Sequence, residues 1–279
     1  MRIRITHDTA YQYERPVRSL IQFLRLTPRD HDGQHLLRWR IEPSADGRLR
    51  PQEDGLGNIV HVFSSEGPVE AITIRVLGEV ETHETHGLVR DTIERVPEVY
   101  YLRETPLTLP DGEIKTFAED TMGDVDADPL AALHRLLDGV KREVTYDVAP
   151  TVSTTTAAEA FALRRGVCQD LTHVFVAAAR HAGIPARYVS GYFRRSDGVD
   201  DQEAGHAWAE AKVPSLGWVG FDAANGISIS EAHVRLAIGL DYLGAAPIRG
   251  SRYGGGSETL AVKLTIDEAR PQSQSQSQA

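Results

Sequence analysis

The residue with the clearest chemical potential is Cys168, the single cysteine in a chain of 279 residues. Without a second thiol the chain can form no intramolecular disulfide, so this cysteine is either a small buried hydrophobic group or a reactive one. A helical pattern begins at this residue, and a helix N-terminus favours a thiolate. His206 and Asp222 follow further along the chain. Cysteine, histidine and aspartate are the residue types of a nucleophile, its general base and the group that orients the base.

His206 and Asp222 fall on two predicted strands that are joined by the turn Pro214-Ser215-Leu216-Gly217. An antiparallel register that pairs Trp208 with Asp222 would make His206 and Asp222 diagonal neighbours on one face, with Cα atoms roughly 7–8 Å apart. A bulge would change this register. A histidine on a strand is more often a satisfied polar residue than a base, and a lone cysteine is more often inert. Residue types and spacing therefore leave a catalytic and a structural interpretation open.

Several predicted elements have to position these side chains. The helix that begins at Cys168 ends at Gly183-Ile184-Pro185, because glycine favours the C′ position and proline cannot continue a helix. A second helix begins with Asp128 as its N-cap and Pro129 at its first position. Shorter helices are predicted at 111–121 and 157–163, and strands at 186–193, 207–213, 218–221 and 259–266.

The first 85 residues contain short alternating segments that are separated by turn clusters such as Asp32-Gly33 and Asp46-Gly47. This pattern is typical of a small antiparallel β-sandwich. We therefore predict an α+β protein with a β-sandwich domain at 1–85, a connector at 86–126 and a core domain at 127–270. The Gln/Ser-rich segment 271–279 is predicted to be a disordered tail.

The composition excludes some classes of partner. The chain is 41% apolar and 25% charged, with a formal net charge of −10, which are values of a globular protein with a sizeable core. An acidic chain argues against nucleic acid and against an anionic membrane as partners. The first residues lack the apolar segment of a signal peptide, and no later run reaches membrane-spanning length. We therefore expect a cytoplasmic protein, in which a reactive thiol stays reduced. The oligomeric state is left open.

The surroundings of the three residues resemble the core of the transglutaminase-like superfamily. The matching stretches are Gly166-Val167-Cys168-Gln169-Asp170, Ala182 to Tyr192, Gly205 to Glu210 and Gly217 to Gly226. The family commonly has Asp-Pro-Thr-Asn-Gly where this chain has Asp222-Ala223-Ala224-Asn225-Gly226, so Asp222 is retained. The N-terminal region also resembles the β domain that precedes this core in many bacterial members, through Tyr13, Arg15-Pro16-Val17, Leu24 to Arg29 and Gly57-Asn58. The ending, Asp241-Tyr242 with Pro247-Ile248-Arg249-Gly250, fits the same group.

The resemblance implies a papain-like core in which Cys168 is the nucleophile, His206 the general base and then acid, and Asp222 the orienting group. The backbone N–H of Cys168 would stabilise the oxyanion, and Tyr146 and Gln169 are tentative second donors. Trp208 and Trp218 either wall the substrate cleft or pack in the core.

The implied reaction is attack on an amide carbonyl to form a thioester, which water resolves in a peptidase or amidase and an amine resolves in a transglutaminase. We expect a cysteine-dependent hydrolase that acts on a peptide or protein substrate. The alternatives are an acyltransferase with an amine acceptor and a non-catalytic interaction module, because members of the superfamily can lose the triad. The sequence lacks a calcium-binding loop pattern, so we expect neither a metal nor a cofactor.

Overall fold

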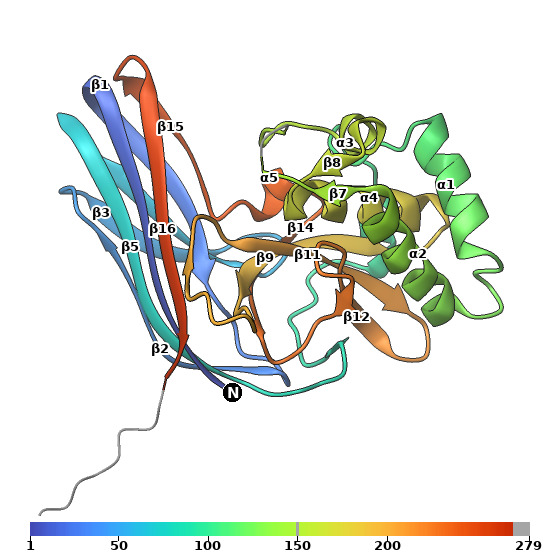
Figure 1. Cartoon of the computed structure of the whole chain (residues 1–279). Coiled ribbons are helices and arrows are strands. Elements are labelled where there is room, and N and C mark those ends of the chain that lie inside the picture. Colours follow the sequence, from blue (N-terminus) through green and yellow to red (C-terminus); the bar gives the residue numbers. More distant parts are fainter. Residues whose placement is uncertain (149–150, 270–279) are drawn as a thin grey trace, which may run out of the picture.

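The computed structural model describes residues 1–148 and 151–269, so the predicted tail at 271–279 lies outside the described residues. The fold has two regions (Figure 1). One is a large antiparallel sheet, and the other is a smaller sheet that helices cover on one face. The predicted α+β class, with an antiparallel β region ahead of a mixed core, is confirmed.

The large sheet has eight strands, most of them from the N-terminal part of the chain. They are β1 (Arg2–Thr27), β2 (Gln34–Pro43), β3 (Arg48–Glu53), β4 (Ile59–Ser65), β5 (Val69–Thr82), β10 (Asp201–Gln202), β15 (Ile248–Gly254) and β16 (Glu258–Glu268). Alternate side chains at the start of β1 are buried, as in Ile3 and Ile5. These side chains pack against apolar residues of β5 and β16 in one continuous core.

Strand β1 is long enough to pair with four other strands. Residues 3–12 lie between β5 and β16, and residues 20–24 lie between β4 and β15. The sequence analysis assigned residues up to 270 to the core domain, and this boundary is wrong because β15 and β16 complete the N-terminal sheet. A local pattern identifies such strands but does not specify a partner at the other end of the chain.

The smaller sheet has the order β13 (Ile227–Ser228), β12 (Gly217–Asp222), β11 (His206–Val213), β9 (Ala186–Phe193) and β14 (His233–Gly239), and β6 (Leu88–Val89) also pairs with β12. Four helices pack on one face: α1 (Gly112–Met122), α2 (Pro129–Glu143), α3 (Ala157–Leu163) and α4 (Cys168–His181). Their apolar side chains share a core with β11 and β12. The remaining elements are η1 (Glu98–Leu102), α5 (Tyr242–Ala245) and the parallel pair β7 (Thr145–Tyr146) and β8 (Arg165–Gly166).

The predicted helix starts agree with the structure, whereas the predicted connector does not. Asp128 caps α2 by accepting a hydrogen bond from the N–H of Ala131 at 2.9 Å. Segment 86–126 contains β6, η1 and α1, and α1 contributes Ile114 and Ala118 to the helical core. This segment is therefore part of the core region. Its prolines interrupt the local pattern without preventing these short elements from packing.

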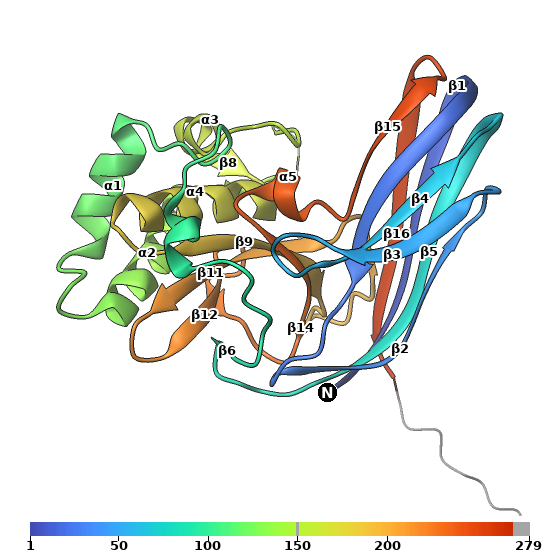
Figure 2. The ribbon, with the colours of Figure 1, turned by 180° about the vertical axis from the view of Figure 1, so that it is seen from behind.

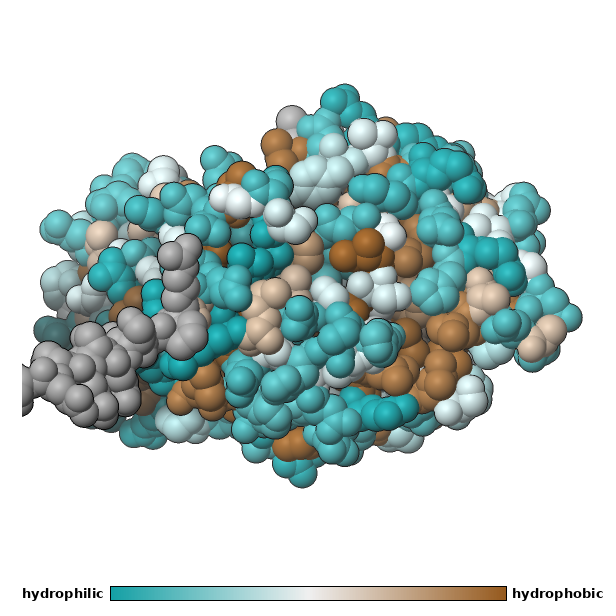
Figure 3. Space-filling model, turned by 60° about the horizontal axis from the view of Figure 1, so that its bottom comes forward, coloured by the Kyte–Doolittle hydropathy of each residue, from teal (hydrophilic) through white to brown (hydrophobic). Residues whose placement is uncertain are grey.

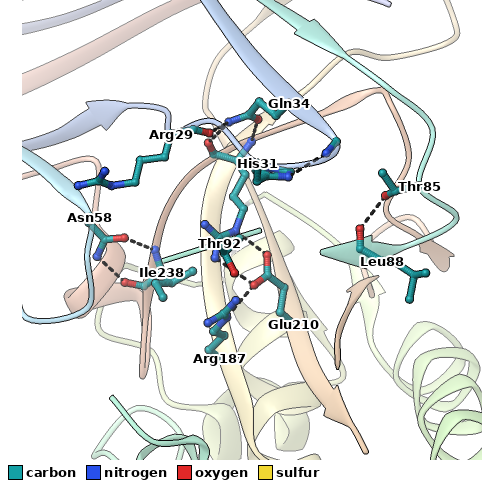
Figure 4. A network of polar contacts seen from close by, with 12 residues as sticks. Arg29, His31, Gln34, Asn58, Thr85, Leu88, Thr92, Arg187, Glu210 and Ile238 are labelled. Atoms are coloured by element: carbon teal, nitrogen blue, oxygen red, sulfur yellow. Dashed lines mark hydrogen bonds and ion pairs between the residues drawn. The ribbon is translucent and has the colours of Figure 1, made fainter. Parts of the chain in front are cut away.

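The two regions meet at β14, an edge strand of the smaller sheet that packs against β1 and β5 (Figure 2). Two amide side chains bind its backbone (Figure 4). Gln34 donates to the carbonyl of Arg235 at 3.0 Å and accepts from its N–H at 2.8 Å. Asn58 donates to the carbonyl of Ile238 at 2.9 Å and accepts from its N–H at 2.8 Å. The amides thus take the place of a neighbouring strand on this edge.

The surface seen in Figure 3 is mainly hydrophilic, with apolar side chains in separate groups, in agreement with the formal charge of −10. Within residues 1–148 and 151–269, no helix combines the length and apolarity that a bilayer crossing requires.

Candidate active site

Cys168 is the first residue of α4, as the helical pattern predicted, and its side chain is half-buried. Residue 167 is a valine and cannot cap the helix, so Asp170 supplies the hydrogen bonds at this end. Its Oδ2 accepts from the N–H of Val167 at 2.8 Å and from the hydroxyl of Thr151 at 2.7 Å. A Cβ on Gly166 would lie 2.7 Å from the Cβ of Asp170, so this turn requires a glycine. Asp170 thus caps the start of this helix.

The β11–β12 hairpin brings His206 and Asp222 together. Ala209 lies opposite Phe221, which is the register that pairs Trp208 with Asp222, as expected from the sequence. His206 is the first residue of β11 and Asp222 the last of β12. Their Nε2 and Oδ2 atoms are 2.7 Å apart. The tight turn and the alternation of side chains are therefore sufficient to form this contact.

The His206 ring is hydrogen-bonded to Asp222, and the side chain of Cys168 is close enough to act on its pKa. Because Asp222 binds Nε2, the nitrogen left for exchange of a proton with the thiol is Nδ1. Burial lowers the pKa of His206, but the interactions with Asp222 and Cys168 outweigh burial and raise the pKa from 6.5 to about 10. The ring therefore carries both protons at neutral pH, next to the sulfur atom.

Asp222 is fully buried and accepts several hydrogen bonds in addition to that of His206. The side-chain amide of Asn225 donates to Oδ2 at 2.6 Å, and the backbone N–H of Asn225 donates to Oδ1 at 3.1 Å. Nε2 of His233 lies 3.1 Å from Oδ2. Burial raises the pKa of Asp222, but the histidine hydrogen bonds prevail and hold it well below its usual value. The carboxyl group is therefore ionised.

His233 is the residue of this cluster that the sequence analysis missed. It begins strand β14, and nothing in the neighbouring residues links it to Asp222. The contact between His233 and Asp222 joins β14 to β12, which are separated in the sheet by β11 and β9. A local sequence pattern does not specify this strand order. Asn225, the other donor to Asp222, lies in the same sequence motif as Asp222 and was therefore among the matching residues.

The two tentative oxyanion donors, Tyr146 and Gln169, belong to segments next to Cys168. Tyr146 on β7 is paired with Gly166, two residues before the cysteine, and its side chain is 51% exposed. Burial and the nearby Cys168 raise the pKa of its phenol, which therefore stays protonated. The side-chain amide of Gln169 donates to the carbonyl of Ser153 at 3.2 Å, which holds it toward the 151–156 loop.

Trp208 and Trp218 do not wall an open cleft, because they are 0% and 3% exposed. Both belong to an apolar cluster on the face of the smaller sheet opposite the helices. The Trp208 ring lies 6.2 Å from the ring of His206, and Trp218 packs under the guanidinium of Arg187 at 3.9 Å. The core-packing interpretation is therefore the correct one for both tryptophans.

Other polar residues of the core have structural roles. His173 is buried and accepts a hydrogen bond from the N–H of Tyr242 at 3.0 Å. Arg187 donates to Glu210 at 2.7 Å, and Glu210 also binds Arg235 of β14 at 2.7 Å (Figure 4). These ion pairs connect β9, β11 and β14.

One group among the described residues has atoms close enough together to hold a metal ion, namely His206, Asp222 and His233, whose ligand atoms lie within 4.8 Å of one another. Both imidazoles already hydrogen-bond to the same carboxylate oxygen. The three side chains satisfy one another without an ion, so their geometry fits a proton-transfer site better than a metal centre.

The comparison with known families agrees with this geometry. The model of the transglutaminase-like superfamily matches residues 115–223, a range that includes Cys168, His206 and Asp222. The model of the bacterial transglutaminase-like N-terminal region matches residues 3–81, which form most of the large sheet. The chain belongs to the transglutaminase-like superfamily.

Relatives from mycobacteria match over nearly the full length. An uncharacterised protein of Mycobacterium leprae is 28% identical over 279 residues, which are 95% of this chain and 98% of the relative. An uncharacterised protein of Mycobacterium tuberculosis is 28% identical over 303 residues, 95% and 92% of the two chains. The crystal structure of a candidate cysteine protease from Cytophaga hutchinsonii has a TM-score of 0.76 at 19% identity and covers 97% of this chain and 91% of that one. The fold is therefore shared over both regions.

Proposed function

We propose that this protein is a cysteine-dependent amide hydrolase that works through a thioester acyl-enzyme. In this proposal Cys168 is the nucleophile, His206 the general base and then acid, and Asp222 the orienting group. The observation that carries it is the His206 ring, which binds Asp222 at 2.7 Å and has its pKa raised by both Asp222 and the nearby Cys168. A nucleophile, a base in hydrogen-bond reach and a group that orients the base are what nucleophilic catalysis requires.

The proposed reaction proceeds in two steps. The thiolate of Cys168 adds to the amide carbonyl carbon, the C–N bond breaks, and the amine leaves with a proton from His206. Water then adds to the thioester while His206 accepts a proton from it. The C–S bond breaks, a carboxylic acid is released, and the thiolate re-forms beside the protonated His206 ring. Asp222 stays ionised throughout and holds the imidazole in one orientation.

The charge on the substrate oxygen needs fixed donors. As the first residue of α4, Cys168 has a backbone N–H with no acceptor within the helix, and the helix dipole adds to its effect. We propose the phenol of Tyr146 as the second donor because it is protonated and within electrostatic range of the sulfur.

Exposed apolar side chains in the segment 146–152, which precedes Cys168, favour a peptide with an apolar residue as substrate. Tyr146, Val148 and Val152 are 51%, 75% and 67% exposed. Val152 stands between Thr151 and Ser153, which both hydrogen-bond to residues in the first turn of α4. We propose that these side chains contact an apolar residue beside the scissile amide, since exposed apolar groups next to a reactive residue are typical of binding surfaces.

An acyl-enzyme trap tests the function. The protein is incubated with a peptide library that contains glutamine, C-terminal amides and both apolar and charged flanking residues, then acid-quenched and analysed by intact and peptide mass spectrometry. We expect an acyl adduct on Cys168 in the wild type and none in Cys168→Ala. No adduct and no cleaved peptide with the wild type would contradict the proposal.

A second arm separates hydrolysis from transfer. The same incubation with a primary amine such as pentylamine yields a free acid if water resolves the thioester, and an amine conjugate if the amine does. We expect the acid as the main product. A predominant conjugate would replace hydrolysis by acyl transfer and leave the roles of Cys168 and His206 unchanged.

A further inference from the structure

His233 is a buried histidine that the proposed reaction steps do not use. It is the first residue of β14, with 6% of its surface exposed. Its ring lies 4.7 Å from that of Phe193 and 5.2 Å from that of Trp208. Its Nε2 is 3.1 Å from Oδ2 of Asp222, the oxygen that also binds His206. Two histidines therefore share one carboxylate oxygen.

The protonation of His233 follows from its other contact. The backbone N–H of Ser230 points at Nδ1 of His233 at 3.1 Å. Because a backbone N–H can only donate, Nδ1 is the acceptor and the proton of the neutral ring is on Nε2. Burial lowers the pKa of His233 despite the nearby Asp222, so the ring remains neutral. His233 is thus a fixed, uncharged donor to Asp222.

We infer that His233 is a positioning residue, which holds the Asp222 oxygen that orients His206. This inference rests on the proposed function, because Asp222 needs fixing only if His206 transfers protons. Three donors from three places meet at Oδ2: His206 at 2.7 Å, Asn225 at 2.6 Å and His233 at 3.1 Å. Each takes a share of the negative charge on this oxygen. His233 therefore also limits how tightly the carboxylate holds the His206 proton, which must leave with the amine.

The N-terminal sheet holds His233 in place. The hydroxyl of Thr82 at the end of β5 donates to the carbonyl of Glu231 at 2.6 Å, two residues before His233. Gln34 and Asn58 bind the backbone of β14 at Arg235 and Ile238 (Figure 4). A chain of contacts thus runs from the large sheet through β14 and His233 to the Asp222 carboxylate. This is a catalytic reason for the N-terminal region to accompany the core.

Two variants separate a positioning role from simple packing. His233→Leu fills a similar volume without a donor, and His233→Gln places an amide N–H close to the position of Nε2. The measurement is the titration of the imidazole nitrogens in ¹⁵N-labelled protein by NMR from pH 5 to 11. The titratable groups around this oxygen are His206 from β11, His233 from β14, Asp222 from β12 and, beyond His206, Cys168 from α4.

In the wild type, we expect His233 to show one protonated nitrogen, Nε2, between pH 7 and 9. In His233→Leu the titration midpoint of His206 rises by roughly one pH unit, because Asp222 has lost a donor and holds the His206 proton more strongly. His233→Gln returns the midpoint to the wild-type value. An unchanged midpoint in the leucine variant, or a wild-type His233 protonated on Nδ1, would overturn the inference.

Failure of the proposed function gives a different result. If Cys168 is not paired with His206, then Cys168→Ala leaves the His206 midpoint of the otherwise wild-type protein unchanged. Iodoacetamide would in that case modify Cys168 no faster than an ordinary free thiol at pH 6. Suppose instead that Cys168→Ala shifts the His206 midpoint and that iodoacetamide modifies Cys168 faster than an ordinary thiol. If His233→Leu then has no effect on the midpoint, the positioning role is rejected and the proposed function stands. The tautomer of wild-type His233 is informative even if the leucine variant does not fold.

Discussion

Each region of the molecule buries a carboxylate among hydrogen-bond donors, but the donors differ. In the large sheet, Glu79 is 2% exposed and binds Arg2 at 3.0 Å, Arg4 at 3.2 Å and also Arg38. In the core, Asp222 binds two histidines and an asparagine. Burial raises the pKa of Glu79, yet the arginines prevail and lower it from 4.5 to about 2. The hydrogen bonds at Asp222 lower its pKa in the same direction.

The two clusters differ in whether the groups bound to the carboxylate can give up a proton. A guanidinium does not give up its proton in a protein, so the Glu79 cluster has one protonation state and can only hold strands together. An imidazole gains and loses a proton near neutral pH, so the Asp222 cluster can pass a proton to a neighbouring group. The same kind of buried anion is therefore structural in one region and chemically useful in the other.

Replacement of the two carboxylates by amides should separate these roles most clearly. In Asp222→Asn the amide no longer favours the productive orientation of the His206 ring, and we expect amide-hydrolase activity to fall by about 10³–10⁴-fold. Glu79→Gln should leave activity within about twofold of the wild type once the protein is folded. The measurement is the initial rate on a peptide found in the trapping experiment. Equal losses in both variants would contradict the distinction.

The free energy of unfolding should depend on different groups at alkaline and at acid pH. The folded-state pKa of His206, about 10, lies above its ordinary 6.5, so its contribution is complete below pH 6.5 and is lost as the pH rises toward 10. We expect a loss on the order of 3 kcal/mol over that range. Glu79 has a lowered pKa, so its contribution is present above pH 4.5 and is lost as the pH falls toward 2.

Urea unfolding across the pH range tests this assignment. His206→Gln should flatten the alkaline side of the stability curve and leave the acid side nearly unchanged. Glu79→Gln should reduce the acid slope alone. A flat alkaline side in the wild type would show that His206 is not the group with the raised pKa.

At neutral pH, Glu79→Gln should lower the free energy of unfolding by about 1–2 kcal/mol. The loss of a buried anion leaves three arginines without their partner, but those arginines are 46%, 47% and 69% exposed, so solvent screens much of the effect. Glu258→Gln is a matched control, because Glu258 is itself 42% exposed and pairs with Arg252 at the surface. A control effect as large as that of Glu79→Gln would argue against a special role of burial.

The smallest effect concerns the junction between the regions. Gln34→Ala and Asn58→Ala each remove an amide that satisfies a backbone N–H and a carbonyl of β14, and we expect each to lower stability by about 1 kcal/mol. Hydrogen exchange at the amides of Arg235 and Ile238 should become faster. Gln12→Ala is the control, since its amide makes a single exposed bond of 3.4 Å. Unchanged exchange at both amides would show that β14 does not depend on these side chains.

Local patterns in the sequence predicted the parts of the site that depend on local geometry. The start of α4 at Cys168 and the hairpin register that joins His206 to Asp222 follow from capping, turn residues and side-chain alternation. The burial of Trp208 and Trp218 did not follow, because alternation identifies a shared face but not whether that face is covered. His233 was missed for a related reason, since its contact with Asp222 is made between strands that are not sequence neighbours.

The same limit applies to the fold. A strand at 259–266 was expected within the core domain, but β16, which contains it, pairs with β1, and so does β15, which was not predicted as a strand. The segment 86–126 read as a connector because short elements such as β6 carry almost no periodic signal. Long-range pairing and two-residue strands are decided by tertiary packing, so a single sequence predicts them poorly.

The pairing of β1 with β16 also affects how the chain folds during synthesis. Ile3 is aligned with Glu268, so this edge of β1 cannot be covered until β16, which is translated long after it, has been made. The free edge of β1 stays open during synthesis and needs protection from aggregation. A shortened chain that lacks β16 would keep Cys168, His206 and Asp222 but leave the large sheet without one of its central strands. The large sheet is thus completed only after the helical core that lies between its strands in the sequence has been synthesised.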